Sequence, residues 1–127
     1  MAINDGGQIV GWSKLAAGAR FAMTQPFYDM AVWDEFLARF GPVPIPVLLG
    51  ILPLQSFRHA EFMHNEVPGI TVPQELRDRL RDAGADAQAE GVRHARHLLQ
   101  VARGRFAGVY LMPSFGRYEN VLDVLKD

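Results

Sequence analysis

Two polar side chains follow the apolar part of a strand expected at residues 20–25. Thr24 and Gln25 come directly before Pro26 in "RFAMTQP". A glutamine amide offers two N–H donors and one acceptor without carrying a charge. It can therefore bind the donor–acceptor edge of a heterocycle such as a pterin, a nicotinamide or a flavin. The alternative is that Gln25 hydrogen-bonds the backbone of a neighbouring loop, and the residues alone leave both interpretations open.

Three apolar stretches end in the same way, as "MTQP", "GILP" and "YLMP". They predict strands near 20–25, 46–52 and 106–112. The strands alternate with helical patterns, which is typical of an α/β protein with a parallel sheet. Ligands of such sheets bind at the carboxyl ends of the strands. Candidate binding residues are therefore Thr24, Gln25, Phe27, Tyr28, Gln55, Ser56, Phe57, Ser114, Phe115, Arg117 and Tyr118.

The helices that connect these strands have recognisable limits. "YDMAVWDEFLARFG" shows a buried stripe and a glycine stop, and Ser56 caps a helix that begins at Phe57. Pro73 begins another helix. We expect the helix from about Asp86 to bury Ala89, Val92, Ala95, Leu99 and Ala102, and the last helix to bury Val121, Leu122 and Leu125. Three strands alone resemble the C-terminal part of a (β/α)8 TIM barrel, which needs eight strands and about 250 residues.

Each of the other candidate residues has two interpretations. Phe57 can stack on a planar ligand or pack against the adjacent loop. Arg117 can pair with a carboxylate or phosphate, or remain solvated. His59 and His64 are five residues apart, whereas a helical zinc pair needs a spacing of four. We therefore expect no metal site, and we expect all four histidines to be structural or solvated.

Composition narrows the class of protein. The chain has 127 residues, 49% of them hydrophobic, which is enough for one domain. A net charge of −1 provides no basic surface for nucleic acid. The longest apolar run, Ile45 to Leu54, is about half the length of a membrane span. The absence of cysteine excludes disulfides and thiolate ligands, and the N-terminus lacks a signal peptide, so we expect a cytoplasmic protein.

Four long segments resemble the C-terminal part of methylenetetrahydrofolate reductases. They are "GARFAMTQPFYD", "PVLLGILPLQSFRHAEFMHNEVPGITVP", "AEGVRHARHLL" and "GVYLMPSFGRYENVLDVL". The resemblance covers roughly residues 11–127 and leaves 1–10 as an unstructured lead-in, which suggests a truncated reading frame. It is strongest to the bacterial branch in which this domain follows a homocysteine S-methyltransferase domain.

The resemblance implies a fold, a reaction and ligand contacts. It implies a barrel that binds FAD and reduces 5,10-methylenetetrahydrofolate to 5-methyltetrahydrofolate, with NADH or NADPH as hydride donor. Gln25 would contact the pterin and the reduced nicotinamide, and Phe57 would pack against substrate. Arg117 would border the same site, although "YLMPSFGRY" departs from the family's tyrosine–threonine–leucine–asparagine–arginine ending.

The resemblance also implies what this chain does not supply. The family's acidic catalytic residue and most of its flavin contacts lie on earlier strands, so we expect no catalytic residue here and assign no cofactor-binding residue. The isolated chain is then expected to be inactive and to bind FAD weakly. Its partner would be the N-terminal half of the barrel or a second copy. The alternative function is a non-catalytic α/β remnant that self-associates or pairs with another chain.

Overall fold

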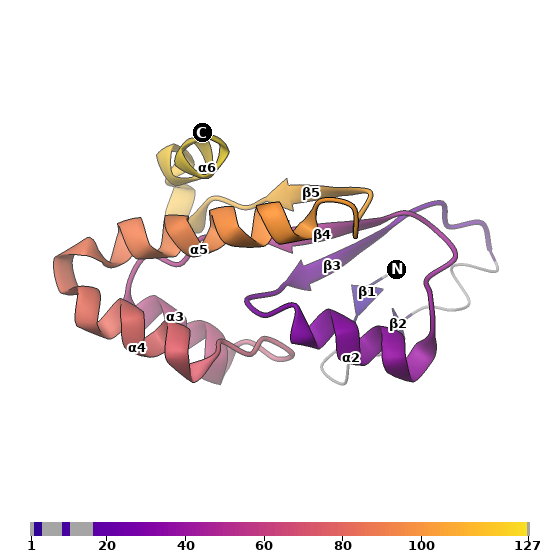
Figure 1. Cartoon of the computed structure of the whole chain (residues 1–127), viewed down its shortest axis with the longest axis horizontal. Coiled ribbons are helices and arrows are strands. Elements are labelled where there is room, and N and C mark those ends of the chain that lie inside the picture. Colours follow the sequence, from indigo (N-terminus) through magenta and orange to yellow (C-terminus); the bar gives the residue numbers. More distant parts are fainter. Residues whose placement is uncertain (1, 4–8, 11–16, 127) are drawn as a thin grey trace.

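The computed structural model describes residues 2–3, 9–10 and 17–126. A short antiparallel pair, β1 (Ala2–Ile3) and β2 (Ile9–Val10), lies in the predicted lead-in, most of which falls outside these ranges. Within them, no helix has the length and hydrophobicity to cross a bilayer. The remaining elements alternate as in Figure 1: β3 (Ala22–Pro26), α2 (Ala31–Phe40), β4 (Val47–Ile51), α3 (Phe57–Glu66), α4 (Gln74–Ala83), α5 (Ala87–Ala102), β5 (Gly108–Leu111) and α6 (Tyr118–Leu125).

The sheet has the order β3–β4–β5, and both pairs of strands are parallel. This confirms the predicted α/β class and the three predicted strands. Parallel neighbours need a crossover connection, and the helices provide it. Among the described residues, the three strands form an open sheet with β3 and β5 as its outer strands, as expected for part of a barrel.

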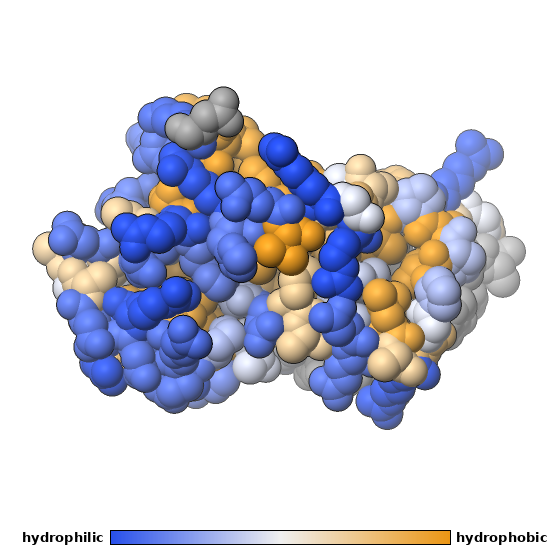
Figure 2. Space-filling model, in the orientation of Figure 1, coloured by the Kyte–Doolittle hydropathy of each residue, from blue (hydrophilic) through white to orange (hydrophobic). Residues whose placement is uncertain are grey.

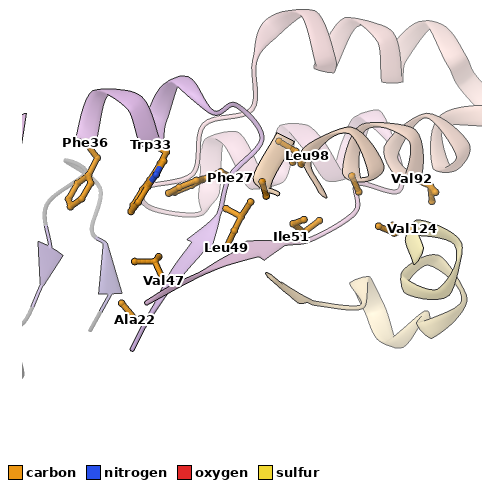
Figure 3. Close-up of a cluster of buried hydrophobic side chains, with 12 residues drawn as sticks. Ala22, Phe27, Trp33, Phe36, Val47, Leu49, Ile51, Val92, Leu98 and Val124 are labelled. Atoms are coloured by element: carbon orange, nitrogen blue, oxygen red, sulfur yellow. The ribbon is translucent and has the colours of Figure 1, made fainter. Parts of the chain in front are cut away.

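The main core lies between one face of the sheet and three helices. Val47, Leu49 and Ile51 alternate along β4 and point toward these helices, as Figure 3 shows. α2 contributes Trp33 and Phe36, whose rings stack 5.2 Å apart between centroids. The rest of the core comes from β3, the loop after it, α5 and α6: Ala22, Phe27, Val92, Ala95, Leu98, Ala102 and Val124. This layer fixes the direction of the strands and hence the position of their carboxyl ends.

The predicted stripes of α5 and α6 are partly wrong. On α5, Ala89 is exposed, and Leu98 is buried in place of the half-buried Leu99. The reason is that the buried face of α5 follows Gly91, Ala95 and Leu98, which lie against the sheet and the loop after β4.

On α6 the buried residues are Asn120 and Val124, whereas Leu122 and Leu125 are exposed and Val121 is half-buried. The buried side of α6 packs against α5, where Gln88 donates a hydrogen bond to the carboxamide oxygen of Asn120. Figure 2 shows hydrophobic surface around this helix.

A second cluster holds the loops that follow β3 and β4. Tyr28 and Leu54 come from those loops, and they pack with buried residues of α3, α4, α5 and the α3–α4 connection: Ala60, Met63, Ile70, Val72, Leu76, Leu80 and Ala87. The Tyr28 hydroxyl donates to the carbonyl of Leu52 at 2.9 Å. The strand-end loops are thus part of a core rather than free surface segments.

α5 approaches the loop after β4 closely at Gly91. A Cβ placed on Gly91 would lie 1.7 Å from the carbonyl oxygen of Leu54. Glycine in the interior of a helix costs about 1 kcal/mol relative to alanine, so this position needs a packing reason, and the Leu54 backbone provides it.

His94 connects α5 to the loop after β3. Its Nε2 lies 2.8 Å from the carbonyl oxygen of Tyr28. Burial lowers the pKa of His94, and the positive charges of Arg79 and His97 lower it further, while the bond to Tyr28 and the charge of Glu90 act in the opposite direction. The folded chain therefore favours the neutral imidazole.

The close approach at Gly91 predicts the effect of adding one methyl group. Gly91→Ala should lower the free energy of unfolding by about 1–3 kcal/mol, because the clash with backbone outweighs the gain in helix propensity. Urea denaturation measures this change. Gln100→Ala, at an exposed site on the same helix, should have little effect. Equal or greater stability of Gly91→Ala would show that α5 and Leu54 are further apart.

The environment of His94 predicts a pH dependence of stability. A histidine has a pKa near 6.5 in the unfolded chain, and the folded state holds it lower, so the unfolded state binds more protons as pH falls below about 6.5. Stability should therefore decrease on acidification through that range. His94→Gln should make the profile less steep, and the remaining slope should come from His59, whose pKa burial also lowers. Gln100→Ala should keep the original profile. A His94→Gln profile identical to that of the original chain would show that another group controls it.

Candidate functional site

The carboxyl ends of β3, β4 and β5 lie side by side because the strands are parallel and adjacent. Each end carries a proline, at Pro26, Pro53 and Pro113. The three loops that follow bring together residues that are up to about 90 positions apart in the sequence. Gln25, Phe57 and Arg117 thus lie on three consecutive strand ends, with Phe57 on the middle one.

Gln25 lies in an irregularity of β3. The register of β3 with β4 shifts between Met23 and Pro26, which is typical of a β-bulge. At this point the Thr24 hydroxyl oxygen accepts a hydrogen bond from the Gly50 N–H at 3.0 Å, and the hydroxyl donates to the Gln25 carbonyl at 2.7 Å. Bulges next to binding sites often redirect a side chain, and here the Gln25 backbone is fixed from within its own strand.

The Gln25 side chain is half-buried. In the part of the chain that the structure describes, its amide has no hydrogen-bond partner, so its donors and acceptor are available to a ligand. This arrangement differs from the alternative in which Gln25 bonds a neighbouring loop.

The loops after β4 and β5 are joined by two hydrogen bonds. The Gln55 amide nitrogen donates to the Ser114 carbonyl at 3.2 Å, and the Ser114 hydroxyl donates to the Pro53 carbonyl at 2.7 Å. Ser114 is buried at the start of the short 3-10 helix Ser114–Gly116 that follows β5. The two strand ends are therefore held at a fixed separation.

A histidine and a phenylalanine meet at the same edge. His59 is buried in the first turn of α3, and its ring lies 5.2 Å from that of Phe115 between centroids. The Gln55 N–H donates to His59 Nδ1 at 3.1 Å, which leaves the proton of the neutral ring on Nε2. Burial lowers the pKa of His59, so an uncharged ring is favoured.

Phe115 is unusual in two respects. It has φ = 52°, the left-handed region that few residues other than glycine adopt, and its side chain is 79% exposed. Backbone conformations of this kind cluster at binding sites. Phe115 is one of the eleven candidates at the strand ends, but the sequence gives no reason to prefer it, because neither its backbone conformation nor its contact with His59 has a local sequence signal.

The three candidates Gln25, Phe57 and Arg117 differ in their surroundings. Phe57 is half-buried and packs against the second cluster, next to Ser56, whose hydroxyl accepts from the His59 N–H at 3.0 Å and caps α3 as predicted. Arg117 is exposed and directly precedes α6. Among the other candidates, Phe27 and Tyr28 belong to the two cores. Roles for Gln25, Phe57 and Arg117 in ligand binding stay predictions.

The four histidines differ in environment. His64 Nδ1 accepts from the Val72 N–H at 3.1 Å, and His59 and His94 also bond backbone groups, whereas His97 is exposed. Across 2–3, 9–10 and 17–126, no three histidine or acidic side chains are grouped so that they could hold a metal ion.

A groove of about 550 Å³ lies between the loop after β3 and two helices. Its lining comes from the loop after β3 and from α4 and α5, and includes Tyr28, Arg79, Glu90 and His94. Gln25, Phe57 and Arg117 do not line it. Glu90 pairs with Arg79 and Arg93, so the charges in this groove are largely satisfied by one another.

Comparison with known proteins supports the fold and identifies a family. A solved structure, described as an uncharacterized protein from Clostridium thermocellum that binds two copies of 5-methyl-5,6,7,8-tetrahydrofolic acid, matches with a TM-score of 0.55 and 17% identity. The match covers 89% of this chain and 43% of that one, so this chain spans less than half of the other's length. At this identity the match supports the fold.

The family model of methylenetetrahydrofolate reductase matches residues 10–104. The matched range includes Gln25 and Phe57 and ends before β5, so Tyr110, Phe115 and Arg117 lie outside it. Because the match covers most of the chain, the chain belongs to the methylenetetrahydrofolate reductase family.

Proposed function

We propose that this chain forms the folate-side wall of a flavin-dependent reductase. The reaction is the reduction of 5,10-methylenetetrahydrofolate to 5-methyltetrahydrofolate, with NADH or NADPH as hydride donor. The observation that supports this most directly is Gln25, which lies inside the family match, on a fixed backbone, with its side-chain amide available. The folate bound by the solved relative supports the same class of ligand.

Each of the three candidates has a role in this proposal. The Gln25 amide hydrogen-bonds the nicotinamide and then the pterin, which bind in turn. Phe57 at the start of α3 packs against the substrate. Arg117 is exposed at the start of α6, where its guanidinium is free to pair with a carboxylate of the folate. The acidic catalytic residue comes from strands that this chain does not contain.

FAD fits the described residues only in part. The strand ends present neutral or aromatic groups at Gln25, His59 and Phe115, which suit the heterocyclic part of a ligand. A flavin dinucleotide also needs cationic donors for its diphosphate, and at the described strand ends the exposed cationic side chains are Arg58 and Arg117. We therefore assign the flavin contacts to the rest of the barrel, and we infer that the isolated chain does not bind FAD tightly.

We also propose a domain context, a compartment and a partner for this chain. The motifs favour the bacterial branch in which a homocysteine S-methyltransferase domain precedes the barrel, and a cytoplasmic enzyme. The partner of this chain is then the segment that forms the first five strands.

The proposal predicts folate binding that depends on Gln25. Titration of 5-methyltetrahydrofolate into the ¹⁵N-labelled chain should shift resonances at the ends of β3, β4 and β5. Gln25→Ala should weaken binding about tenfold, the effect of losing one or two well-placed hydrogen bonds. Gln100→Ala removes an exposed glutamine amide from α5 and should leave binding unchanged. Equal weakening in both variants, or shifts scattered over the chain, would contradict the proposal.

One observation favours the second candidate function, a non-catalytic protein that associates with itself. The face of the sheet opposite the helices exposes Phe21 to 55% and Met23 to 39%, and β3 and β5 are the outer strands of the sheet in the described part of the chain. Exposed apolar side chains and free strand edges favour association.

Self-association through this face predicts a change in mass with one substitution. Phe21→Asp should convert a concentration-dependent oligomer to a monomer in analytical ultracentrifugation. Phe62→Asp, at a phenylalanine of similar exposure on α3, should not. A monomer at all concentrations for the original chain, or the same loss of association in both variants, would exclude this candidate.

A further inference from the structure

Tyr110 spans the sheet from β5 to β3. Its hydroxyl donates a hydrogen bond to the backbone carbonyl of Thr24, although β4 lies between the two strands. Burial raises the pKa of Tyr110, so the hydroxyl keeps its proton and acts as a donor. The carbonyl that it binds belongs to the residue directly before Gln25.

Gly50 makes this contact possible. A Cβ on Gly50 would lie 2.6 Å from the Tyr110 hydroxyl oxygen and 3.0 Å from the Thr24 carbonyl oxygen. Any side chain at position 50 would therefore displace Tyr110 from β3. An isolated glycine in a strand is typical of such a close approach, and the reason here is passage of the tyrosine across β4.

The contact coincides with the register shift of β3. Thr24 is fixed there on two sides, because its hydroxyl bonds Gly50 and Gln25 and its carbonyl accepts from Tyr110. A bulge leaves backbone groups outside the regular ladder, and those groups need other partners. Tyr110 provides the partner for Thr24.

We propose that Tyr110 is a positioning residue. Its hydroxyl holds the Thr24 carbonyl across β4, and this contact fixes the direction in which the side-chain amide of Gln25 points. The inference rests on the proposed function for the role of Gln25 in binding, but not for the contact itself. Tyr110 lies outside residues 10–104, so the family match does not include it. The carboxyl ends of β3 and β5 are thereby coupled, because a shift in the position of one strand end also moves the other.

The test compares Tyr110→Phe with the original full chain. Phenylalanine keeps the ring over Gly50 and removes only the donor. Amide hydrogen exchange at Thr24 and Gln25 should become at least about tenfold faster, because the local structure opens more often, while exchange at Leu49 and the melting temperature change little. The Gln25 side-chain NH₂ resonances should move toward their unfolded positions. Affinity for 5-methyltetrahydrofolate should fall about five- to tenfold.

Two further variants make the test specific. Gln100→Ala removes an exposed side-chain amide from α5 and should change none of these readouts. Thr24→Val should resemble Tyr110→Phe at Gln25, because it also releases the bulge, and Thr24→Ser should restore the original behaviour. Rescue by serine separates loss of the hydroxyl from general disruption of packing.

The outcomes separate the inference from the proposed function. Unchanged exchange and unchanged Gln25 resonances in Tyr110→Phe would overturn the inference. An original chain that does not bind the folate would overturn the proposed function, and the exchange rates at Gln25 would then still support or refute the role of Tyr110.

Discussion

The structure depends on one constraint: a parallel sheet is stable only when its apolar faces are covered. Here α2, α5 and α6 cover one face with a continuous core around Val47, Leu49 and Ile51. The crossover connections that bring these helices onto that face also place all three strand ends at one edge. The position of the candidate site is therefore a consequence of how the core is buried. The opposite face lacks such a cover in the described chain, which agrees with a part of a larger barrel.

At the strand ends, backbone interactions matter as much as side-chain identity. The register shift in β3, the bonds of Thr24 to Gly50 and Gln25, and the bond from Tyr110 keep one short segment of backbone in place. The bonds between Gln55, Ser114 and Pro53 do the same for the other two loops. Preorganisation of this kind lowers the entropic cost of binding, because the polar groups are already oriented before the ligand arrives. The site is polar without being strongly charged, which suits a heterocycle with donors and acceptors along one edge.

Much of the fold could be predicted from sequence because its signals are local. Apolar runs bounded by prolines located the three strands, and Ser56 located the start of α3. The faces of α5 and α6 were less predictable, because which residues are buried depends on the distant segment that packs there. Leu98 is buried rather than Leu99, because the face of α5 that approaches the Leu54 backbone at Gly91 continues through Ala95 and Leu98.

The candidate site was likewise predictable only where the sequence signals are local. Gln25, Phe57 and Arg117 could be placed at strand ends from the sequence. Their supports could not, because Tyr110 and Thr24 are 86 residues apart, and the contact of His59 with Phe115 requires a folded loop. Gly50, a glycine within an apolar strand, was the local signal that could have pointed to a close contact.

The most direct test of the central claim is reconstitution of the reductase. The chain would be mixed with a separately expressed segment that supplies the first five barrel strands of a homologous reductase, together with FAD, and NADH oxidation by 5,10-methylenetetrahydrofolate would be measured. If the chain is the folate-side wall, the mixture should oxidise NADH at a rate that depends on both proteins, and Gln25→Ala should reduce that rate while Gln100→Ala should not. A flavin-loaded N-terminal segment that shows no activity with this chain over a wide range of concentrations would contradict the claim.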